Sequence, residues 1–395
     1  MMTNEASANK RSQETKVSYK DFPIQEFVEE YERAKEVIDS LRRCTRCVLP
    51  ETFPFITFDE DGVCNYCHHY AKMNPRGVDA LRDAFNLHQK ADGSVKCLVS
   101  FSGGRDSSYT LHYVSRVLGL DTIAFTYDWG VVPDLAHRNQ KRMCEQLGVE
   151  QVVITANLQK KYDHIRANLE AWLKKPNLGT IPLLTGVGQQ FFYLVHRVAK
   201  RTDRQPIVIG ATPMETTYFK TGFSGIEPEF DHSKRVFERK IKLAFSYLDS
   251  YLKNPAYINR SLWDTLTGYI SINFVPRNFV RLFEYIRWDE NEVNNTLIND
   301  YGWETSDETA NTWRIDDGTV PMSDYMYYIM SGLTINDTFR SNQIREGEIT
   351  REEALEILDI ENAPRFNGIQ WYCGKIGADF EKSLRIVNQA PRLYM

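Results

Sequence analysis

Between residues 96 and 214 the chain alternates short apolar runs with longer stretches in which apolar residues recur every three or four positions. Short apolar runs bounded by turn residues are typical of buried strands, and the longer period is typical of a helix with one buried face. Strands separated by helices predict an α/β fold with a doubly wound parallel sheet. We expect strands at 96–101, 121–127, 150–155 and 206–210, and helices from about 105, over 134–147 and over 188–200.

The segments on either side of this region have different patterns. Apolar residues from Ile24 to Leu41 recur at helical spacing, and beyond residue 215 the segments 237–252 and 279–298 also have apolar helical faces. Thr350 with Glu353 forms a capping box for a later helix. We divide the chain into a disordered polar tail at 1–20, an N-terminal helix at 21–43, a four-cysteine segment at 44–70, an α/β domain at 90–226 and a helical region at 227–395 that completes the active site.

The turn after the first expected strand reads Ser-Gly-Gly-Arg-Asp-Ser-Ser. Gly103 and Gly104 have no Cβ, so the backbone can approach a ligand closely, and the N-terminus of the following helix favours an anion. Asp106 would repel phosphates unless a cation lies between them, which implies Mg²⁺. The chain has no G-x-x-x-x-G-K-S/T motif, so this is not the common P-loop. The candidate nucleotide contacts are Ser102, Gly103, Gly104, Arg105, Asp106, Ser107 and Ser108.

Four cysteines form a C-x2-C-x16-C-x2-C pattern, a spacing typical of a zinc site. Each C-x2-C pair offers two thiolates, and two pairs complete a tetrahedron. Because all four ligands would be sulfur, no position is left for a substrate, and we predict a structural Zn²⁺; an iron–sulfur cluster is the alternative. Apolar residues between the pairs, followed by Asp61-Gly62, predict a hairpin. The predicted metal ligands are Cys44, Cys47, Cys64 and Cys67.

Composition and charge narrow the class of protein. The 395 residues, with 42% hydrophobic and 26% charged side chains, are ordinary for a soluble globular protein of two or three domains. A net charge of −5 argues against a dedicated nucleic-acid binder, and we expect the basic residues near 234–242 to be a solvated face rather than an RNA contact. The N-terminus lacks the apolar core of a secretory signal, and no run of 18 apolar residues is present to span a membrane. We expect a cytoplasmic protein with reduced thiols.

Two sets of motifs resemble known proteins. The string SGGRDSS resembles the S-G-G-x-D-S signature of the PP-loop ATP pyrophosphatases. The chain as a whole is similar to the N-acetyl sugar amidotransferase family of that superfamily, in an ordered match over most of its length. The matching segments are GVCNYC, VSFSGGRDSSY, YDWG, IGATPMET, YIRWDENEVNNTLINDYGWE and GEITREEALEIL.

This resemblance implies a reaction and its cofactors. Enzymes of the superfamily bind the pyrophosphate end of ATP in the loop and transfer AMP to a substrate oxygen. Members of the family convert an N-acetyl group of a nucleotide-linked sugar into an acetamidino group in surface-polysaccharide pathways, using ATP, Mg²⁺ and ammonia from a separate glutaminase. The turn after the second strand holds the adenosine in such enzymes, and the fourth strand approaches it. The residues implied here are Tyr127, Asp128, Gly130, Gly210 and Ala211.

One departure from the family concerns the acceptor. Family members carry a C-x2-C pair before the helix at 188–200, where this chain reads Ile-Pro-Leu-Leu-Thr-Gly at 181–186. The identity of the acceptor sugar is therefore open, whereas the use of ATP is not. No glutaminase module is recognisable in the chain, so we expect ammonia to come from a partner.

Two arginines, Arg340 and Arg345, lie in a dense polar string ahead of the capping box. Arginine makes bidentate contacts with phosphate groups, so we expect both to contact pyrophosphate or a substrate diphosphate and to act in catalysis with Asp106. A salt-bridge cluster on the surface is the alternative. The string WRIDDGT at 313–319 is equally polar, and the sequence assigns it no role.

Three other functions stay open. Sulfur transfer to tRNA is also PP-loop chemistry, but it uses cysteines near the nucleotide, and only Cys97, Cys144 and Cys373 are spare. Ligation onto a carboxylate would use the same loop. A non-enzymatic, zinc-containing nucleotide-binding subunit would be excluded by ATP turnover with any acceptor. A homodimer is compatible with the sequence, which does not define the oligomeric state.

Overall fold

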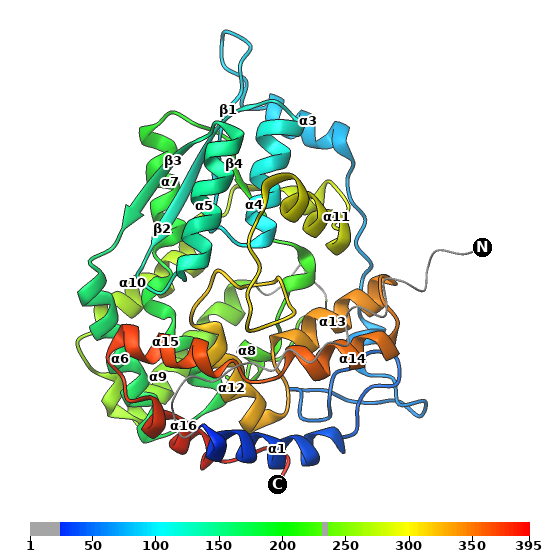
Figure 1. The fold of residues 1–395 in the computed structure, drawn as a ribbon, viewed down its shortest axis with the longest axis vertical. Coiled ribbons are helices and arrows are strands. Elements are labelled where there is room, and N and C mark those ends of the chain that lie inside the picture. The colour runs from blue at the N-terminus through cyan, green and yellow to red at the C-terminus, as the bar shows by residue number, and fades with distance from the viewer. Residues whose placement is uncertain (1–23, 231–235) are drawn as a thin grey trace.

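The computed structural model describes residues 24–230 and 236–395, and the tail expected at 1–20 lies outside these ranges. A five-stranded parallel sheet in the order β3-β2-β1-β4-β5 forms the upper part of the molecule (Figure 1). The predicted fold class, a doubly wound parallel α/β sheet with an N-terminal four-cysteine segment and a helical C-terminal region, is confirmed. The strands are β1 Lys96–Ser100, β2 Asp121–Asp128, β3 Glu150–Thr155, β4 Ile207–Ile209 and β5 Phe279–Arg281.

Helices make up most of the remaining regular structure. The helices predicted near the N-terminus and at 134–147, 188–200 and 237–252 are present, whereas α3 and α6 were not predicted. The α-helices are α1 Gln25–Asp39, α2 Asn65–His68, α3 Val78–Asn86, α4 Arg105–His112, α5 Asp134–Leu147, α6 Leu158–Lys174, α7 Phe191–Arg201, α8 Phe219–Gly222, α9 Val236–Lys253, α10 Leu262–Phe274, α11 Glu290–Asn295, α12 Val320–Ser331, α13 Ile335–Glu346, α14 Arg351–Glu361, α15 Phe366–Ile376 and α16 Phe380–Asn388.

Helices cover both faces of the sheet because successive residues of a strand point to opposite sides. Leu98 and Ile207 pack on one face with Val195 of α7. Val99 belongs to the core on the other face, together with Leu111 of α4. The central strands are therefore apolar on both sides, which is why they appear in the sequence as continuous apolar runs.

One part of the expected helical region is a strand. The prediction of a helix over 279–298 is wrong at its start, because Phe279–Arg281 forms the edge strand β5, with Arg281 opposite Ile209 of β4. Helix α11 begins only at Glu290. Three residues are too few to show the alternation that marks a strand in a sequence. The extended backbone of β5 is specified by its pairing with β4.

The four-cysteine segment has little regular structure. The predicted hairpin is reduced to a single antiparallel bridge between Phe58 and Cys64, and Gly62 in its turn has φ +78°. Residues 51–56 form turns, because the N–H groups of Phe53 and Ile56 bond to carbonyl groups three residues earlier. The full hairpin was therefore a wrong prediction, although a short turn does join the two cysteine pairs.

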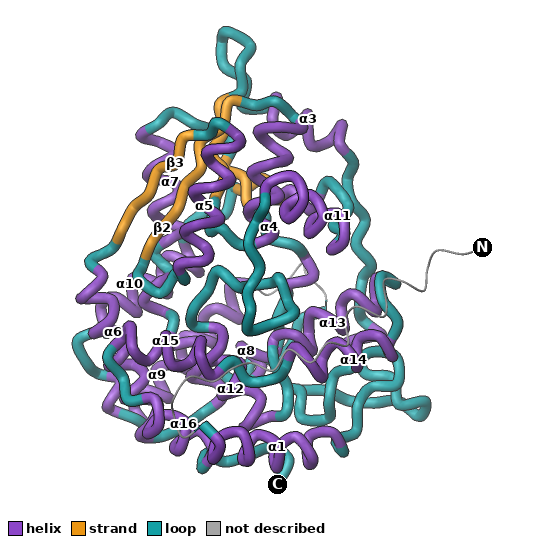
Figure 2. Tube along the Cα trace, in the orientation of Figure 1, coloured by secondary structure: helices purple, strands orange, loops and turns teal. Residues whose placement is uncertain are grey.

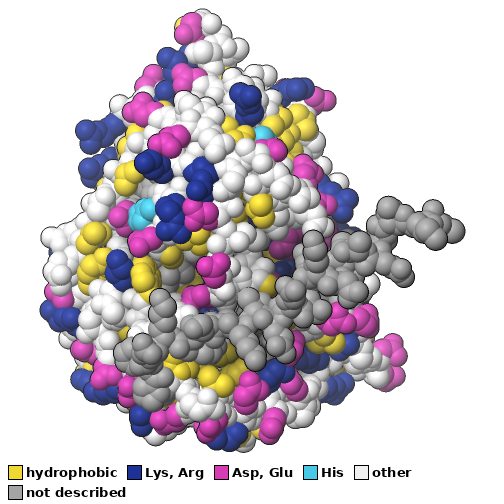
Figure 3. Space-filling model, in the orientation of Figure 1, with side chains coloured by type: hydrophobic (Ala, Val, Ile, Leu, Met, Phe, Trp, Pro, Cys, Tyr) yellow, Lys and Arg dark blue, Asp and Glu magenta, His cyan; other side chains and the backbone are white. Residues whose placement is uncertain are grey.

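The helical C-terminal region lies below the carboxyl edge of the sheet, where α1 and α16 are neighbours (Figures 1 and 2). An irregular segment at 302–319 runs from α11 down to α12, between the sheet and this lower layer (Figure 2). Acidic and basic side chains are intermingled on the face shown in Figure 3. Among the helices of the described ranges, none is both long enough and apolar enough to cross a membrane.

Candidate active site

The loop 102–108 joins β1 to α4 at the carboxyl edge of the sheet. Gly103 has φ +86°, a conformation that favours glycine, and a Cβ there would lie 2.5 Å from the carbonyl oxygen of Ala136. A Cβ on Gly104 would lie 2.5 Å from the carboxylate of Asp316. Both glycines are therefore required by close packing, with α5 on one side of the loop and the string 313–319 on the other.

Hydrogen bonds hold this loop from several directions. The Ser107 hydroxyl donates to the Gly104 carbonyl oxygen at 3.1 Å and lies 2.9 Å from the Ser102 hydroxyl. Gln140 of α5 donates to the Ser102 carbonyl oxygen at 2.7 Å, and the Trp303 indole donates to the Gly103 carbonyl oxygen at 3.1 Å. The loop therefore has a fixed shape before any ligand binds.

Arg105 and Asp106 pair with each other inside the protein. Asp106 accepts hydrogen bonds from Arg105 Nε at 3.1 Å and from the Trp288 indole at 2.8 Å. Arg105 is 1% exposed, and it also donates to Glu290 at 2.9 Å and to Thr312 at 3.0 Å. The Arg105 guanidinium thus neutralises Asp106 within the protein, and a cation bound at Asp106 would compete with it.

The string 313–319, to which the sequence assigned no role, lies directly over this loop. Asp317 accepts a hydrogen bond from Arg314 at 2.7 Å and one from the Thr319 hydroxyl at 2.6 Å. Arg314 has φ +55°, which is uncommon for a residue with a side chain. Gly318 donates to the carbonyl oxygen of Val131 and so ties the string to the segment that follows β2. This arrangement brings Asp316 and Asp317 to the loop. The feature of the sequence that could have pointed to this role is the high density of charged residues in the string.

Burial changes the titration of these carboxyl groups. Burial, and then the charge of Asp106, raises the pKa of Glu215 in the turn after β4 to about 8. Burial also raises the pKa of Asp316. For Asp317 the effect of burial is outweighed by Arg314 and Thr319, and its pKa is lowered. The loop therefore faces several acidic groups with different affinities for protons.

Three cavities follow one another along the carboxyl edge of the sheet. The β2 cavity, of 250 Å³, lies beyond β1 and β2; the loop cavity, of 320 Å³, lies over the loop; and the β5 cavity, of 660 Å³, lies beyond β4 and β5. The β2 and loop cavities share Ser100, Ser102, Phe191, Phe192, Asp316 and Asp317. The loop and β5 cavities share Phe192, Ile209, Ala211 and Glu215.

The predicted nucleotide contacts divide into two groups. Tyr127 lines the β2 cavity, while Gly103, Ser108, Asp128 and Gly130 line neither the β2 cavity nor the loop cavity. Asp128 accepts a hydrogen bond from the Gly130 N–H at 2.9 Å, which closes the turn after β2. The predicted contacts that line the loop cavity are Ser102, Gly104, Arg105, Asp106, Ser107, Gly210 and Ala211.

The two arginines predicted to contact an anion have partners within the protein. Arg340 pairs with Glu290 at 2.7 Å and also with Glu361. Arg345 donates from Nε to the sulfur of Cys67 and from Nη2 to the sulfur of Cys47, each at 3.3 Å. Both arginines are buried, so the alternative of a surface salt-bridge cluster does not describe them. Neither lines the loop cavity, although Arg345 lines the β5 cavity, and their contact with a phosphate stays a prediction.

The four predicted cysteine ligands come together in a buried cluster. Their sulfur atoms all lie within 4.8 Å of one another, with 3.9 Å between Cys44 and Cys67 and 3.8 Å between Cys47 and Cys64. A tetrahedral ion with metal–sulfur bonds of about 2.3 Å has sulfur–sulfur edges of about 3.8 Å. A four-iron cluster spreads its cysteine sulfurs over four different irons and needs a wider spacing. The geometry therefore fits a single tetrahedral metal ion.

Carboxylate oxygens around the loop cavity fit a different kind of ion. Mg²⁺ prefers oxygen ligands, and the walls of this cavity supply four carboxyl groups. These belong to Asp106, which the sequence predicted, and to Glu215, Asp316 and Asp317, which it did not. The donor set is thus suitable for Mg²⁺ bound together with a polyphosphate.

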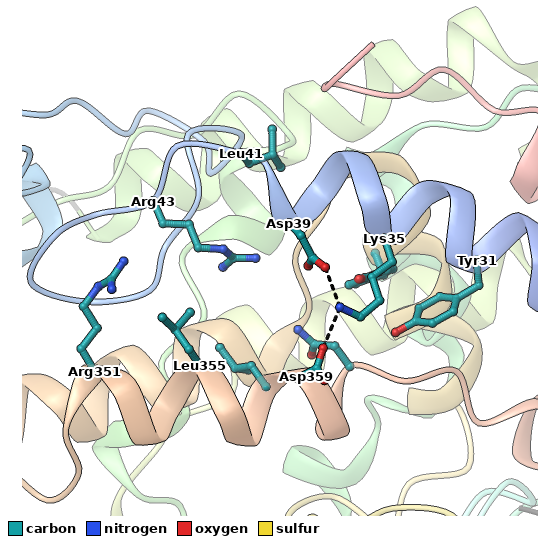
Figure 4. A pocket seen from close by; sticks show the side chains of 11 residues that line it. Tyr31, Lys35, Asp39, Leu41, Arg43, Arg351, Leu355 and Asp359 are labelled. Atoms are coloured by element: carbon teal, nitrogen blue, oxygen red, sulfur yellow. Dashed lines mark hydrogen bonds and ion pairs between the residues drawn. The ribbon is translucent and has the colours of Figure 1, made fainter.

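A further cavity, of 390 Å³, lies between α1 and α14 (Figure 4). Lys35 lies 2.6 Å from both Asp39 and Asp359 there. Arg43 donates to Asp337 at 2.8 Å. Since these charges are already paired and no residue of loop 102–108 lines this cavity, it is not the candidate active site.

No protein-family model matches this chain, and no curated protein matches it. Among solved structures, the chain is similar to the NH3-dependent NAD synthetase from Campylobacter jejuni, at 14% identity over 49% of this chain and 93% of that chain, with a TM-score of 0.25. It is also similar to the U34-tRNA thiolase NcsA from Methanococcus maripaludis with its 4Fe–4S cluster, at 13% identity over 66% of this chain and 83% of that chain, with a TM-score of 0.23. At these values neither similarity bears on the activity of this chain.

Proposed function

We propose that this chain is an ATP-dependent, AMP-forming amidotransferase that acts on the N-acetyl group of a nucleotide-linked sugar in surface-polysaccharide biosynthesis. The observation that carries this proposal is the continuous row of three cavities along the carboxyl edge, with the glycine loop at its centre. Parallel α/β sheets bind ligands at this edge. A loop between two cavities can hold the phosphates of ATP while the nucleoside lies in one cavity and an acceptor lies in the other.

ATP fits this row in one direction. The β2 cavity has aromatic walls from Tyr127, Trp129 and Phe191, which suit an adenine ring. The loop cavity then receives the phosphates, which face backbone N–H groups at the N-terminus of α4. Mg²⁺, when bound by the carboxylates of Asp106 and Asp316, would offset the negative charge of the pyrophosphate group.

The reaction follows from which phosphorus atom is accessible. When the loop holds the β- and γ-phosphates as one leaving group, the α-phosphorus is left open to attack by an acceptor that enters from the β5 cavity past Ala211 and Glu215. The acceptor amide oxygen attacks the α-phosphorus, a P–O bond forms, and pyrophosphate leaves. Ammonia then adds to the activated carbon, and AMP departs with the former amide oxygen. The protein contributes by positioning the reactants and by stabilising charge.

The spare cysteines support ammonia from a separate glutaminase. Cys97, Cys144 and Cys373 are buried, and burial raises the pKa of the Cys97 thiol to about 11 and of the other two to about 12. A thiol with a raised pKa is a poor nucleophile for hydrolysing glutamine. The same property argues against transfer of sulfur by these cysteines to a tRNA.

Isotope labelling tests the proposal. An acceptor whose acetyl oxygen is ¹⁸O should give AMP that carries the label, together with pyrophosphate and an amidine product, when ammonium is added. Formation of ADP, or of unlabelled AMP during productive turnover, would rule out activation of the oxygen by adenylation. A carboxylate acceptor would also label AMP, but its product would be an amide, which mass spectrometry separates from an amidine.

A further inference from the structure

The β5 cavity is the largest of the three and lies beyond the part of the row that fits ATP. Its walls come from segments far apart in the chain: the end of the four-cysteine segment, the turn after β4, the strand β5 and helix α13. Two arginines, Arg277 just before β5 and Arg281 at its end, line the cavity. Neither is part of the loop or of the cysteine cluster.

These two arginines have few partners for their charge. The guanidinium of Arg277 lies 4.8 Å from the centre of the Phe192 ring, and Nη2 donates to the carbonyl oxygen of Ile272. Its other N–H groups have no hydrogen-bond partner among the described residues. Arg281 has a 3.4 Å contact with Glu284, and both side chains of that pair are exposed by about two fifths. Such an ion pair contributes little, so the arginines remain available to an anion.

The two guanidinium groups also repel each other. Burial lowers the pKa of Arg277, and the charge of Arg281 lowers it further. The third arginine of the cavity, Arg345, directs its donors to the sulfurs of Cys67 and Cys47. An anion between Arg277 and Arg281 would remove this repulsion, and a diphosphate has enough oxygen atoms to contact both.

Part of the cavity wall is aromatic. His69 and Phe230 are stacked at 4.3 Å with an angle of 14° between their planes, and Tyr66 packs edge-on against Phe230 at 5.4 Å. Tyr218 lies next to Tyr66, and its ring also lines the cavity. A flat ring system can pack against such a wall, whereas a bare phosphate gains nothing from it.

We propose that the β5 cavity binds the acceptor as a nucleoside diphosphate ester, with Arg277 and Arg281 on the diphosphate and the aromatic wall against the nucleobase. The far end of the ester then extends toward Ala211 and Glu215, where the cavity joins the loop cavity. This assignment rests on the proposed function, because it takes the loop and β2 cavities as the ATP site.

Binding of UDP to the full chain tests this assignment. The ATP site is first filled with α,β-methylene-ATP, and UDP is then titrated by calorimetry. Wild-type protein should bind UDP under these conditions, and Arg277→Ala and Arg281→Ala should each weaken it about tenfold, because a charge-assisted hydrogen bond is lost. Arg277→Lys keeps the charge without the planar fork and should give an intermediate affinity. Arg82→Ala, which removes a 64% exposed arginine on α3, is the matched control and should leave UDP binding unchanged.

Several results would overturn the assignment. UDP affinity that is unaffected by Arg281→Ala, or absence of UDP binding to wild-type protein that binds the ATP analogue, would remove the diphosphate site. If inorganic pyrophosphate or geranyl diphosphate bound as tightly as UDP, the assignment of a nucleobase to the aromatic wall would be wrong. Thermal unfolding checks that each variant is folded. If Arg277→Ala does not fold, Arg281→Ala, on the edge strand β5, decides the test. Failure of the proposed function would be seen separately, as absence of binding of the ATP analogue. In that case, titration of UDP without the analogue would still test whether the β5 cavity binds a nucleoside diphosphate.

Discussion

At the scale of single residues, the residue types at positions 104 and 340 are constrained for different reasons. Gly104 has φ −76°, which any residue can adopt, so its backbone does not require glycine. It is required by the space that the Asp316 carboxylate occupies. Arg340, in contrast, is fixed by its two carboxylate partners, Glu290 and Glu361.

Gly104→Ala should weaken ATP binding. The new methyl group must displace either the Asp316 carboxylate or the loop, and either shift would disturb the proposed phosphate site. We expect about a tenfold loss of affinity for α,β-methylene-ATP by calorimetry, which corresponds to roughly 1.4 kcal/mol. Gly374→Ala is the control, since nothing lies within 4 Å of a Cβ there and α15 gains a better helix former. Equal ATP-analogue affinity in both variants would contradict this role of Gly104.

Arg340→Ala should destabilise the fold. The substitution leaves the buried Glu361 without its guanidinium partner, whereas Glu290 keeps Arg105, and removal of one partner of a buried ion pair costs about 3–5 kcal/mol. Unfolding in urea would measure the loss. A variant of unchanged stability that no longer turns over ATP would instead support the catalytic contact expected from the sequence.

At the scale of elements, α13 is a polar helix in a buried position. Thr334 and Asp337 form a capping box at its start, and Gly347 ends it in a left-handed conformation. Its polar side chains point to partners on other segments, as Arg340 does to Glu361 and Arg345 to the cysteine sulfurs. The helix is therefore held by specific polar pairs as well as by Ile335 and Phe339, which belong to the core.

Glu348→Gln should stabilise the protein at alkaline pH. Burial raises the pKa of Glu348 to about 7, and the charges of Asp289 and Glu290 add to this effect. Since the folded state holds this proton more tightly than the unfolded chain, ionisation costs stability above about pH 7, and the cost disappears below about pH 4.5. We expect a gain of the order of 1–2 kcal/mol at pH 8, allowing for solvent screening, and none at pH 4.

Thermal or urea unfolding of Glu348→Gln across this pH range would measure the gain. Glu356→Gln, at an exposed position in the middle of α14, is the control and should show no such pH dependence. A gain that is the same at pH 4 and pH 8 would show that ionisation of Glu348 is not its cause.

At the scale of the whole molecule, the cysteine cluster is linked to the carboxyl edge of the sheet, where the candidate active site lies. Arg345 donates to two cluster sulfurs and to Asn342 at 2.8 Å, and Asn342 donates at 2.8 Å to the carbonyl oxygen of Met214 in the turn after β4. Arg351 donates to the carbonyl oxygens of Cys44 and Cys47. A metal at the cluster would thus stabilise both the C-terminal helices and the turn that carries Glu215.

Metal removal should therefore affect both stability and ATP binding. We predict one zinc ion per chain by elemental analysis of anaerobically purified protein. Chelation, or Cys64→Ser, should lower the thermal midpoint, because the free energy of metal binding contributes to folding. Affinity for the ATP analogue should fall with it and return when Zn²⁺ is restored to the chelated protein. Stoichiometric iron with sulfide would contradict the zinc prediction, and an unchanged midpoint after chelation would contradict the structural role.

Local patterns in the sequence determined the central strands, the glycine turn and the pairing of C-x2-C motifs. The apolar runs at 96–101 and 121–127 are strands because a strand buried on both faces must be apolar throughout. The cysteines could be grouped because each pair is only three residues apart, and two such pairs satisfy one tetrahedral ion.

Tertiary contacts alone decided the rest. β5 is a strand because β4 lies beside it, and Asp316 reaches the loop because the segment 302–319 folds back over the sheet edge. Arg345 was expected to bind phosphate, and in the structure it donates a hydrogen bond to the sulfur of Cys67, 278 positions away. An arginine has the same donors for a phosphate, a carboxylate or a thiolate, so its sequence context does not specify the partner. Only the path of the chain in space determines which of these groups it meets.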